Sequence, residues 1–436
     1  MKLHELAETL GLSVLPTSWV VHWDEFIAGY DPAGRSLRMS AGVVDELGEH
    51  LAMPPRVRDA LHAHLRLFDE QPGMNALFQF CCHLLYDKQV HQGVGNWPIF
   101  KDSHLPGGNM LYAYVFLAGR RYALQQHGRL GIPARVTDDT LSDIFTWMED
   151  YHSKHGHWGL AMVGWVANYV LRTKLLQLGR LQFVQDTFKP PFRGYRHRSS
   201  NAVVMLAREG RKYRADGQFE GENQRLDPNG PWTSTLEVTD TTIRGHVVHP
   251  DGCVRREPST LPADAWEMVF DQGSPAVSVH IPACGPLTFD ACRASIEQAL
   301  AFFPRHFPER PFDVIYCYSW MMDAQLKAYL SADANLVRFL NEFYLFPYPN
   351  TSGWQTIERT FGRANIDLAR VEARTSLQRA VLDHIRKGGA WRCSGGVIFP
   401  SAYVPGNQPY RADAWAQHVH AGPPSITASP TIGGTR

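Results

Sequence analysis

Residues 277–288 read Val277-Ser278-Val279-His280-Ile281-Pro282-Ala283-Cys284-Gly285-Pro286-Leu287-Thr288, and this stretch decides the fold. Apolar and polar side chains alternate up to Ile281 and stop at Pro282, which predicts a strand. Thr288 suits a helix cap, and the apolar residues after it recur at helical spacing. A second strand is predicted over 312–319, a short helix over 323–330 and a third strand over 336–346. Strands that alternate with helices are typical of an α/β sheet.

The turn between the first strand and its helix is a candidate anion site. The first amides of a helix have no partner inside the helix, and the helix dipole adds partial positive charge there. The amides over 283–287 would form this site, with Thr288 as the cap. Pro286 supplies no amide hydrogen, and Asp290 puts a carboxylate in the first helical turn. Many turns of this kind bind nothing, so the turn alone does not decide the function.

The chain before this stretch divides into a helical part and a β-rich part. Apolar spacing predicts helices over 57–68, 110–126 and 140–152, and a buried central helix over 159–177. Strands are predicted over 181–184, 201–208 and 235–248. Near the C-terminus, Thr375 and Gln378 form a capping box for a last helix that ends at Gly388. We therefore predict an α+β or α/β chain: a helical domain over 1–176, a mixed sheet with flanking helices over 177–412 and a disordered tail over 413–436.

Composition excludes several classes of partner. Among the 436 residues, 43 Lys and Arg balance 43 Asp and Glu. A neutral chain does not predict binding to nucleic acid or to an anionic membrane surface. Its seven cysteines are scattered and form no C-x-x-C pair, which favours free thiols. No run reaches the ~20 apolar residues that span a bilayer, and the charged first residues do not resemble a secretory signal. The cytoplasm is the expected location.

Several motifs resemble one bacterial family of acyltransferase domain-containing proteins. Members of this family pair an N-acyltransferase N-terminal domain with a GNAT-like C-terminal domain. Besides 279–288, the matching motifs are Gly156-His157-Trp158-Gly159-Leu160, Leu178-Gly179-Arg180-Leu181-Gln182-Phe183, Arg214-Ala215-Asp216-Gly217-Gln218, Tyr318-Ser319-Trp320-Met321-Met322-Asp323, Ala334-Asn335-Leu336-Val337-Arg338-Phe339 and Arg374-Thr375-Ser376-Leu377-Gln378-Arg379. Together they extend over residues 150–400.

The resemblance implies an acyl-CoA or acetyl-CoA donor, held between two parallel strands that part from one another. Those strands would be 277–281 and 312–319. The donor-binding residues implied are Val279 and Ile281 on the first strand and Ala283, Cys284, Gly285, Leu287 and Thr288 after it. The usual GNAT loop has a Gln or Arg and two small residues, whereas this loop keeps only Gly285. An acyl carrier protein carries a single phosphodiester, so it would need less anion binding from such a loop.

Four residues are candidates for the chemistry, each with a structural alternative. His280 could act as base because a free imidazole titrates near neutral pH. Tyr329 could protonate the leaving thiolate, or it could pack in a helix face with Leu326. Ser319 could hydrogen-bond the donor or cap the next helix, and Asp323 could be a base or a helix-terminal charge. His280 could equally be a buried strand histidine.

Candidate acceptor residues are Trp158, Gln182 and Trp320, which also suit a domain interface. The acceptor would be an amine of a small molecule or a peptide. His152, His155 and His157 are spaced in part like metal ligands, but Gly156 interrupts them, and we expect no metal site. Acyl transfer to an amine is therefore the first interpretation of the sequence. The alternative is a GNAT-like protein that binds or scaffolds without catalysis.

Overall fold

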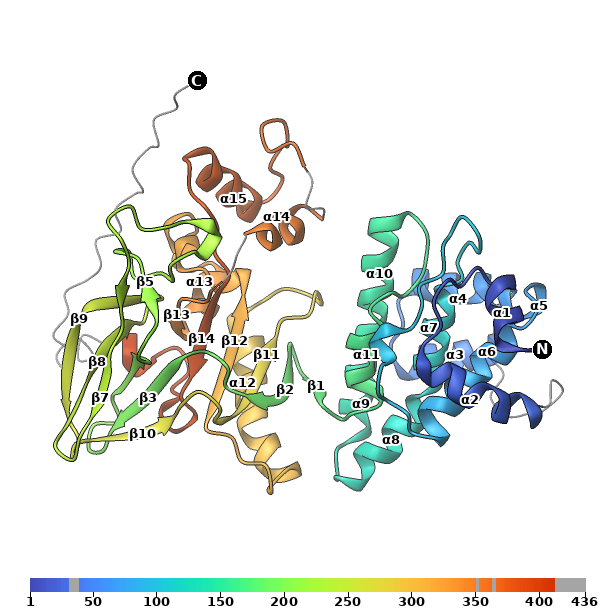
Figure 1. The fold of residues 1–436 in the computed structure, drawn as a ribbon, viewed down its shortest axis with the longest axis horizontal. Coiled ribbons are helices and arrows are strands. Elements are labelled where there is room, and N and C mark those ends of the chain that lie inside the picture. The colour runs from blue at the N-terminus through green and yellow to red at the C-terminus, as the bar shows by residue number, and fades with distance from the viewer. Residues whose placement is uncertain (31–38, 350–352, 363–365, 412–436) are drawn as a thin grey trace. The chain divides into compact units, whose positions relative to one another are not determined.

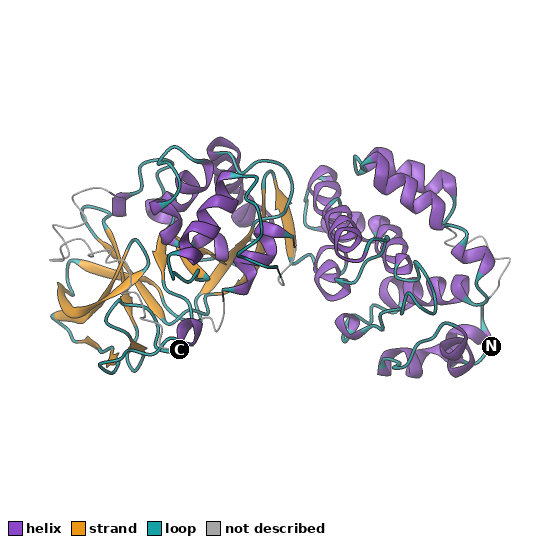
Figure 2. Cartoon of the chain, turned by 90° about the horizontal axis from the view of Figure 1, so that it is seen from above, coloured by secondary structure: helices purple, strands orange, loops and turns teal. Residues whose placement is uncertain are grey.

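The computed structural model describes residues 1–30, 39–349, 353–362 and 366–411. The chain forms two compact units, one of Met1–Phe183 with Ile281–Gly285, the other of Val184–His280 with Pro286–Arg436. Figure 1 follows the elements along the chain, and Figure 2 separates helices from strands by colour. The tail predicted over 413–436 lies outside the described residues. The domain limits predicted from the sequence stay a prediction.

The first unit is built from helices up to Val170. They are α1 (Leu3–Thr9), α2 (Thr17–Ala28), α3 (Ala41–His50), α4 (Pro55–His64), α5 (Leu67–Glu70), α6 (Met74–Cys82), α7 (Met110–Ala118), α8 (Arg120–Arg129), α9 (Ala134–Leu141), α10 (Asp143–His155) and α11 (Val163–Val170). The predicted helix over 110–126 is two helices, because the chain bends at Gly119. A Cβ there would come within 2.4 Å of the Tyr86 hydroxyl, so only glycine permits this packing.

The predicted central helix over 159–177 is wrong. α11 covers only Val163–Val170, and the end of the predicted helix is the strand β1 (Leu175–Leu178). Thr173 lies between them with a φ of 45°. A β-branched residue in the left-handed region cannot continue a right-handed helix. The apolar run is therefore divided between a helix and a strand, which its composition alone did not reveal.

Among the described residues the strands form one mixed sheet, one antiparallel sheet and a two-stranded antiparallel sheet of β5 (Lys212–Tyr213) and β6 (Trp232–Thr233). The longer strands are β2 (Leu181–Thr187), β3 (Phe192–His197), β4 (Val203–Ala207), β8 (Thr242–His249), β9 (Cys253–Pro262), β10 (Trp266–Phe270), β11 (Pro275–His280), β12 (Val314–Ser319) and β14 (Ser394–Ile398), and two further short ones are β7 (Leu236–Val238) and β13 (Tyr344–Phe346). The mixed sheet has the order β1-β2-β11-β12-β14-β13. The larger antiparallel sheet has the order β10-β3-β4-β8-β7, with β9 on β8, and a large buried aromatic and aliphatic core includes residues of both of these sheets.

Helix α12 (Phe289–His306) follows β11 as predicted, and Thr288 caps it by accepting a hydrogen bond from the Ala291 amide. Cys292, Ile296, Ala299 and Phe303 are all buried on its apolar face. The strand predicted over 336–346 is wrong in its first half. Asn335–Asn341 forms the helix α13, and only Tyr344–Phe346 is a strand. Val337 and Leu340, three residues apart, are both buried, so this run has the spacing of a helix.

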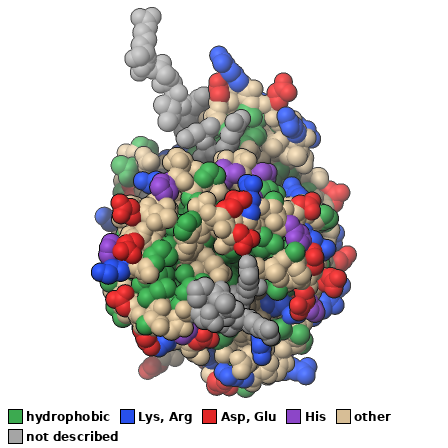
Figure 3. All heavy atoms as spheres, turned by 90° about the vertical axis from the view of Figure 1, so that its right-hand side faces the viewer, with side chains coloured by type: hydrophobic (Ala, Val, Ile, Leu, Met, Phe, Trp, Pro, Cys, Tyr) green, Lys and Arg blue, Asp and Glu red, His purple; other side chains and the backbone are tan. Residues whose placement is uncertain are grey.

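The remaining helices are α14 (Trp354–Phe361) and α15 (Ser376–Arg386). The predicted capping box at Thr375 and Gln378 is confirmed, and Gly388 follows the helix with a φ of 78°. None of the helices in the described ranges is long and apolar enough to cross a bilayer. Figure 3 shows acidic and basic side chains interspersed on one face of the molecule, as the equal numbers of the two signs would suggest.

Candidate functional site

Strands β11 and β12 run parallel and then part. Their paired residues are Ala276 with Val314, Val277 with Ile315 and Ser278 with Tyr316. This register of paired residues ends at Ser278 and Tyr316, and β11 extends two residues further, to His280. β12 continues instead against β14, where Ser319 pairs with Ser394. The two predicted strands therefore separate at their carboxyl ends, beside the turn that leads to α12.

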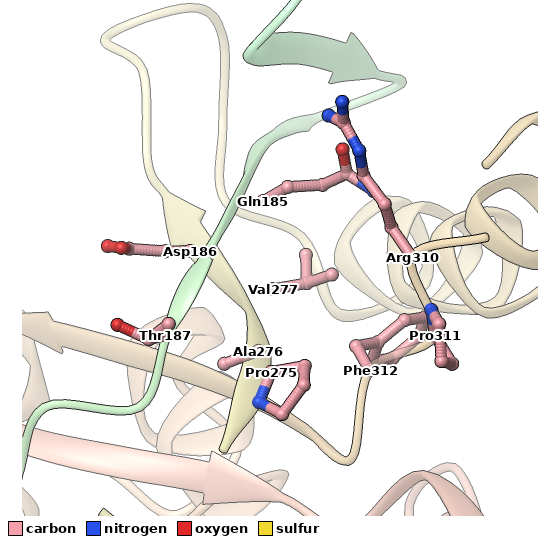
Figure 4. Close-up of a pocket in the computed structure, with 9 residues that line it drawn as sticks. All are labelled: Gln185, Asp186, Thr187, Pro275, Ala276, Val277, Arg310, Pro311 and Phe312. Carbon is pink, nitrogen blue, oxygen red and sulfur yellow. The ribbon is translucent and has the colours of Figure 1, made fainter. Parts of the chain in front are cut away.

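The face of the sheet that carries His280 also carries Asp186 and Tyr316. Successive side chains of a strand point to opposite faces, so Ser278 and His280 share a face with Tyr316, the partner of Ser278. The Tyr316 hydroxyl donates a hydrogen bond of 3.1 Å to the Asp186 carboxylate on β2. Figure 4 shows Asp186 pointing away from Gln185 and Val277, which lie on the other face. Three neighbouring strands thus present polar groups on one surface.

Burial changes the acid–base character of His280. It lowers the pKa of His280 to about 4, although the nearby Asp186 carboxylate acts in the opposite direction. The expectation that this pKa lies near neutrality is wrong, because desolvation disfavours the charged imidazolium. At neutral pH the imidazole is uncharged and can accept a proton. It is, however, a weaker base than a free histidine.

Asp186 is a charged neighbour for this histidine. Burial alone would raise the pKa of Asp186, but hydrogen bonds from the Thr187 backbone, Lys189 and Tyr316 together lower it. The Lys189 ammonium lies 3.0 Å from the Asp186 carboxylate. Burial, with Asp186 adding to it, raises the pKa of Tyr316 well above its usual range. Tyr316 therefore remains a hydrogen-bond donor, and Asp186 remains an anion.

Exposed aromatic side chains continue this surface beyond Tyr316. Tyr318 lies two residues further along β12 and is 46% exposed. Its ring stacks on that of Tyr348 with 4.9 Å between the centroids and 5° between the planes. The Tyr316 ring lies 6.5 Å from that of Tyr318, at 15°. A row of three tyrosines therefore leads from the buried core to solvent beside the parted strands.

The turn after β11 is open and is braced from one side. Gly285 has a φ of 62°, and no atom lies within 4 Å of the place where its Cβ would be. Within the described residues, the backbone amides of Ala283, Cys284, Gly285 and Leu287 donate no backbone hydrogen bond. Arg180 donates to the carbonyl oxygens of Pro282 and Gly285, at 3.0 and 3.1 Å. Amides without acceptors in a glycine turn, just before a helix, are suited to holding an anion.

Two candidate catalytic residues serve as caps in the structure. Ser319 accepts a hydrogen bond from the Met321 amide at 3.2 Å and caps a 3₁₀ turn. Asp323 is buried and accepts hydrogen bonds from the amides of Gln325 and Arg392, at 3.0 and 2.8 Å. These contacts favour the structural alternatives for both residues. Neither contact involves the face that carries His280.

Tyr329 lies in a different cluster. Its hydroxyl shares a hydrogen bond of 3.1 Å with Nδ1 of His384, and its ring packs near that of Trp391. Burial lowers the pKa of His384, while a hydrogen bond with the Ala390 backbone acts against that shift. The half-buried phenol therefore has a polar partner already, which suits either packing or proton donation.

The candidate acceptor residues lie in separate settings. Trp158 stacks on His152 with 4.4 Å between the ring centroids. The buried Gln182 donates to Gln177 Oε1 at 3.3 Å. Trp320 opens the 3₁₀ turn η4 (Trp320–Met322) after β12. Of the other two histidines in the spaced trio, His155 stacks on Tyr151, and His157 pairs with Asp102.

The hollow drawn in Figure 4 lies at the other end of β11 from His280. It has a volume of about 280 Å³ and is lined by Gln185, Asp186, Thr187, Pro275, Ala276, Val277, Arg310, Pro311 and Phe312. Gln185, Asp186, Thr187 and Arg310 give this lining its polar and charged side chains, and the other lining residues are apolar. This hollow thus lies away from the carboxyl ends of β11 and β12.

The sequence did not single out Asp186, Tyr316 or Arg180 as functional. Asp186 and Tyr316 are 130 residues apart in the sequence. They meet because the sheet places β2 and β12 on either side of the same strand, β11. Arg180 belongs to one of the motifs that resemble the family, and this was the available signal. Its contact with the turn after β11, over 100 residues away, could not be inferred from spacing.

Two family models place the chain among the GNAT-like acyltransferases. The GNAT-like C-terminal domain matches residues 175–398, just over half of the 436 residues. The N-acyltransferase N-terminal domain matches residues 43–170. The chain belongs to the family of proteins with this GNAT-like C-terminal domain, as the resemblance implied, and is an acyltransferase by family.

Solved structures give the same fold. An acyltransferase in complex with decanoyl-CoA and teicoplanin matches with a TM-score of 0.62 and 22% identity, over 92% of this chain and 99% of that one. An acyltransferase mutant in complex with octanoyl-CoA matches with a TM-score of 0.61, at the same identity and coverage. Comparison with curated protein sequences gives no match.

Proposed function

We propose that this protein is an N-acyltransferase that moves an acyl group from acyl-CoA to an amine. The observation that carries the proposal is the parting of β11 and β12 beyond Ser278 and Tyr316. In the proposed complex the pantetheine arm enters where the strands part, as in other GNAT folds. The backbone amides of Ala283, Cys284, Gly285 and Leu287 and the N-terminus of α12 bind the diphosphate, because aligned amides and the helix dipole favour an anion.

The proposed chemistry begins with a neutral amine that attacks the thioester carbonyl carbon. The oxyanion that forms is stabilised by backbone amides of β11, including that of Val279. His280 takes the proton that the nitrogen loses, and the Asp186 anion stabilises the resulting imidazolium. The carbon–sulfur bond then breaks, and CoA leaves as the thiolate. Tyr329 is the proposed donor of the proton that converts this thiolate to the thiol.

The low pKa of His280 has a consequence for this step. An imidazole with a pKa of about 4 is uncharged over the whole neutral range, so no proton has to leave it before the reaction. Its proton affinity is modest, and Asp186 offsets part of this weakness. A base works best when its pKa is close to the working pH. We therefore propose that the paired His280 and Asp186, rather than His280 alone, accept the proton that the attacking amine loses.

The acceptor is proposed to be an amine of a small molecule or peptide that approaches the face with His280. One structurally similar acyltransferase was solved with teicoplanin and decanoyl-CoA bound. The stacked Tyr318 and Tyr348 support an acceptor larger than a simple alkylamine, because aromatic rings bind flat groups by stacking. Because that similar structure also contains decanoyl-CoA, we propose a long-chain acyl-CoA as the donor. An acyl carrier protein remains the alternative donor.

Two measurements test the proposal. Calorimetry with acetyl-CoA and decanoyl-CoA should detect binding, and a thiol reagent should detect CoA release only when an amine is added. Binding without thiol release, over a panel of small amines and amine-bearing peptides, would favour the non-catalytic alternative. Release from an acyl-loaded carrier protein but not from acyl-CoA would identify the carrier as donor.

A further inference from the structure

We infer that Arg180 is the positioning residue for the donor-phosphate turn between β11 and α12. The inference rests on the proposed function, because it assigns a role in binding the diphosphate of acyl-CoA. Arg180 comes from the tight connection between β1 and β2, where Gly179 has a φ of 66°. It therefore reaches the turn from a different part of the sequence.

Arg180 contacts three atoms of the turn. Nη1 donates to the Pro282 carbonyl oxygen at 3.0 Å, and Nη2 donates to the Gly285 carbonyl oxygen at 3.1 Å. Nη1 also lies 3.7 Å from the Cys284 Sγ. The planar guanidinium thus spans the turn from Pro282 to Gly285. A lysine ammonium could not make both carbonyl contacts in this fixed geometry.

These hydrogen bonds from Arg180 fix the direction of an amide hydrogen in the turn. In a trans peptide the C=O and the next N–H point in opposite directions, and none of the described peptide bonds is cis. Because the Pro282 carbonyl faces Arg180, the Ala283 amide points away from it. The Ala283 amide has no backbone acceptor among the described residues. Arg180 therefore holds one side of the turn and leaves the donors of the other side for an anion.

Two glutamines brace the same turn. Gln177 Nε2 lies 3.7 Å from Cys284 Sγ and donates to the Gly179 carbonyl oxygen at 3.2 Å. The buried Gln182 in turn donates to Gln177 Oε1 at 3.3 Å. Gln182, considered above as an acceptor residue, therefore supports the phosphate turn indirectly, through Gln177. Together these contacts fix a turn that has a single glycine and a proline, and they add a positive charge beneath it.

The experiment compares Arg180→Ala, Arg180→Lys and Arg172→Ala in the full chain. Arg172 is the control, because Arg172→Ala removes the same positive charge from the chain without touching the turn. Its exposed side chain donates to Asn168 and to the His91 carbonyl oxygen. Calorimetry measures acetyl-CoA and the phosphate-free S-acetylpantetheine. Arg180→Ala should weaken acetyl-CoA binding by roughly 10–100-fold, the range for charge-assisted hydrogen bonds, and leave S-acetylpantetheine unchanged. Arg180→Lys should not restore the affinity, and Arg172→Ala should have no effect.

Alkylation of Cys284 gives a second readout, which reports directly on the turn. Mass spectrometry would follow modification by N-ethylmaleimide at Cys284, which is only partly buried. Arg180→Ala should speed this modification severalfold, and CoA should slow it in the unaltered chain. Unchanged alkylation together with unchanged acetyl-CoA affinity in Arg180→Ala overturns the inference alone. Failure of the unaltered chain to bind any acyl-CoA overturns the proposed function as well.

Discussion

The hydroxyl of Tyr316 donates to the carboxylate of Asp186 at 3.1 Å, and this bond joins β12 to β2 across β11. It lies on the face where His280 ends the middle strand. Because Lys189 also pairs with Asp186, the carboxylate is held charged and in place next to the imidazole. The proposed base thus depends on both strands that flank its own strand.

Replacement of Tyr316 by phenylalanine tests this dependence. The Tyr316→Phe variant keeps the aromatic contact with Phe188 but leaves Asp186 without one hydrogen bond. We expect the free energy of unfolding to fall by about 1 kcal/mol, and kcat to fall by roughly 10-fold because Asp186 is less well placed. Steady-state rates with acetyl-CoA and a panel amine check this. Tyr112→Phe is the control, because it removes the hydrogen bond from the Tyr112 hydroxyl to the Pro98 carbonyl oxygen. It should lower the free energy of unfolding by a similar amount and leave kcat unchanged.

His280 is tested by replacement with alanine. If it is the base, kcat should fall by roughly 10²–10⁴ while the Kd for the donor changes little. His249 is a matched control, because burial also lowers its pKa to about 4, yet it lies in β8 beside Asp251. His249→Asn should lose stability without losing turnover. Parallel losses of melting temperature and activity in His280→Ala would assign His280 a structural role.

The pH dependence of turnover gives an independent measure of His280. With an amine that stays unprotonated above pH 5, the rate should fall only as the pH approaches about 4, where His280 takes up its proton. A histidine with an ordinary pKa would instead lose half of its activity near pH ~6.5. A midpoint near the higher value would contradict the burial of His280 as described.

Sequence patterns located the strand–turn–helix unit because its signals are local. The alternation up to Ile281 and the cap at Thr288 need no distant partner. The runs over 159–177 and 336–346 were misassigned because a short apolar run fits either a helix or a strand. The contact of Asp186 with Tyr316 depends on the strand order β2-β11-β12, which no spacing in the sequence encodes. The low pKa of His280 likewise follows from burial, which only the folded chain reveals.

Buried and partly buried histidines also set how stability responds to pH. Burial lowers the pKa values of His127, His249 and His280 to about 4 each. Between the unfolded pKa of ~6.5 and about 4, the unfolded chain binds protons that the folded chain does not, so stability falls as the pH falls through this window. For the fully buried His127 the loss amounts to at most ~3 kcal/mol over the whole window.

Urea unfolding at pH 7 and pH 5 measures this effect. The midpoint should be lower at pH 5, and His127→Asn should reduce the difference between the two midpoints. Equal midpoints at the two pH values in the unaltered chain would contradict the expectation.

The exposed tyrosine row tests the nature of the acceptor. Tyr318→Ala removes the stacked partner of Tyr348 beside the parted strands, at a side chain that is 46% exposed. If the row binds a flat group of the acceptor, KM for an aromatic amine should rise roughly 5–10-fold, since one aromatic contact contributes about 1 kcal/mol. KM for a short alkylamine, which cannot stack, should stay as it is, and so should the Kd for acyl-CoA. Met268→Ala, at an exposed position on β10, serves as the control. Because Tyr318→Phe keeps the ring, it should retain the low KM, whereas a loss as large as that of Tyr318→Ala would show that the hydroxyl binds the acceptor instead.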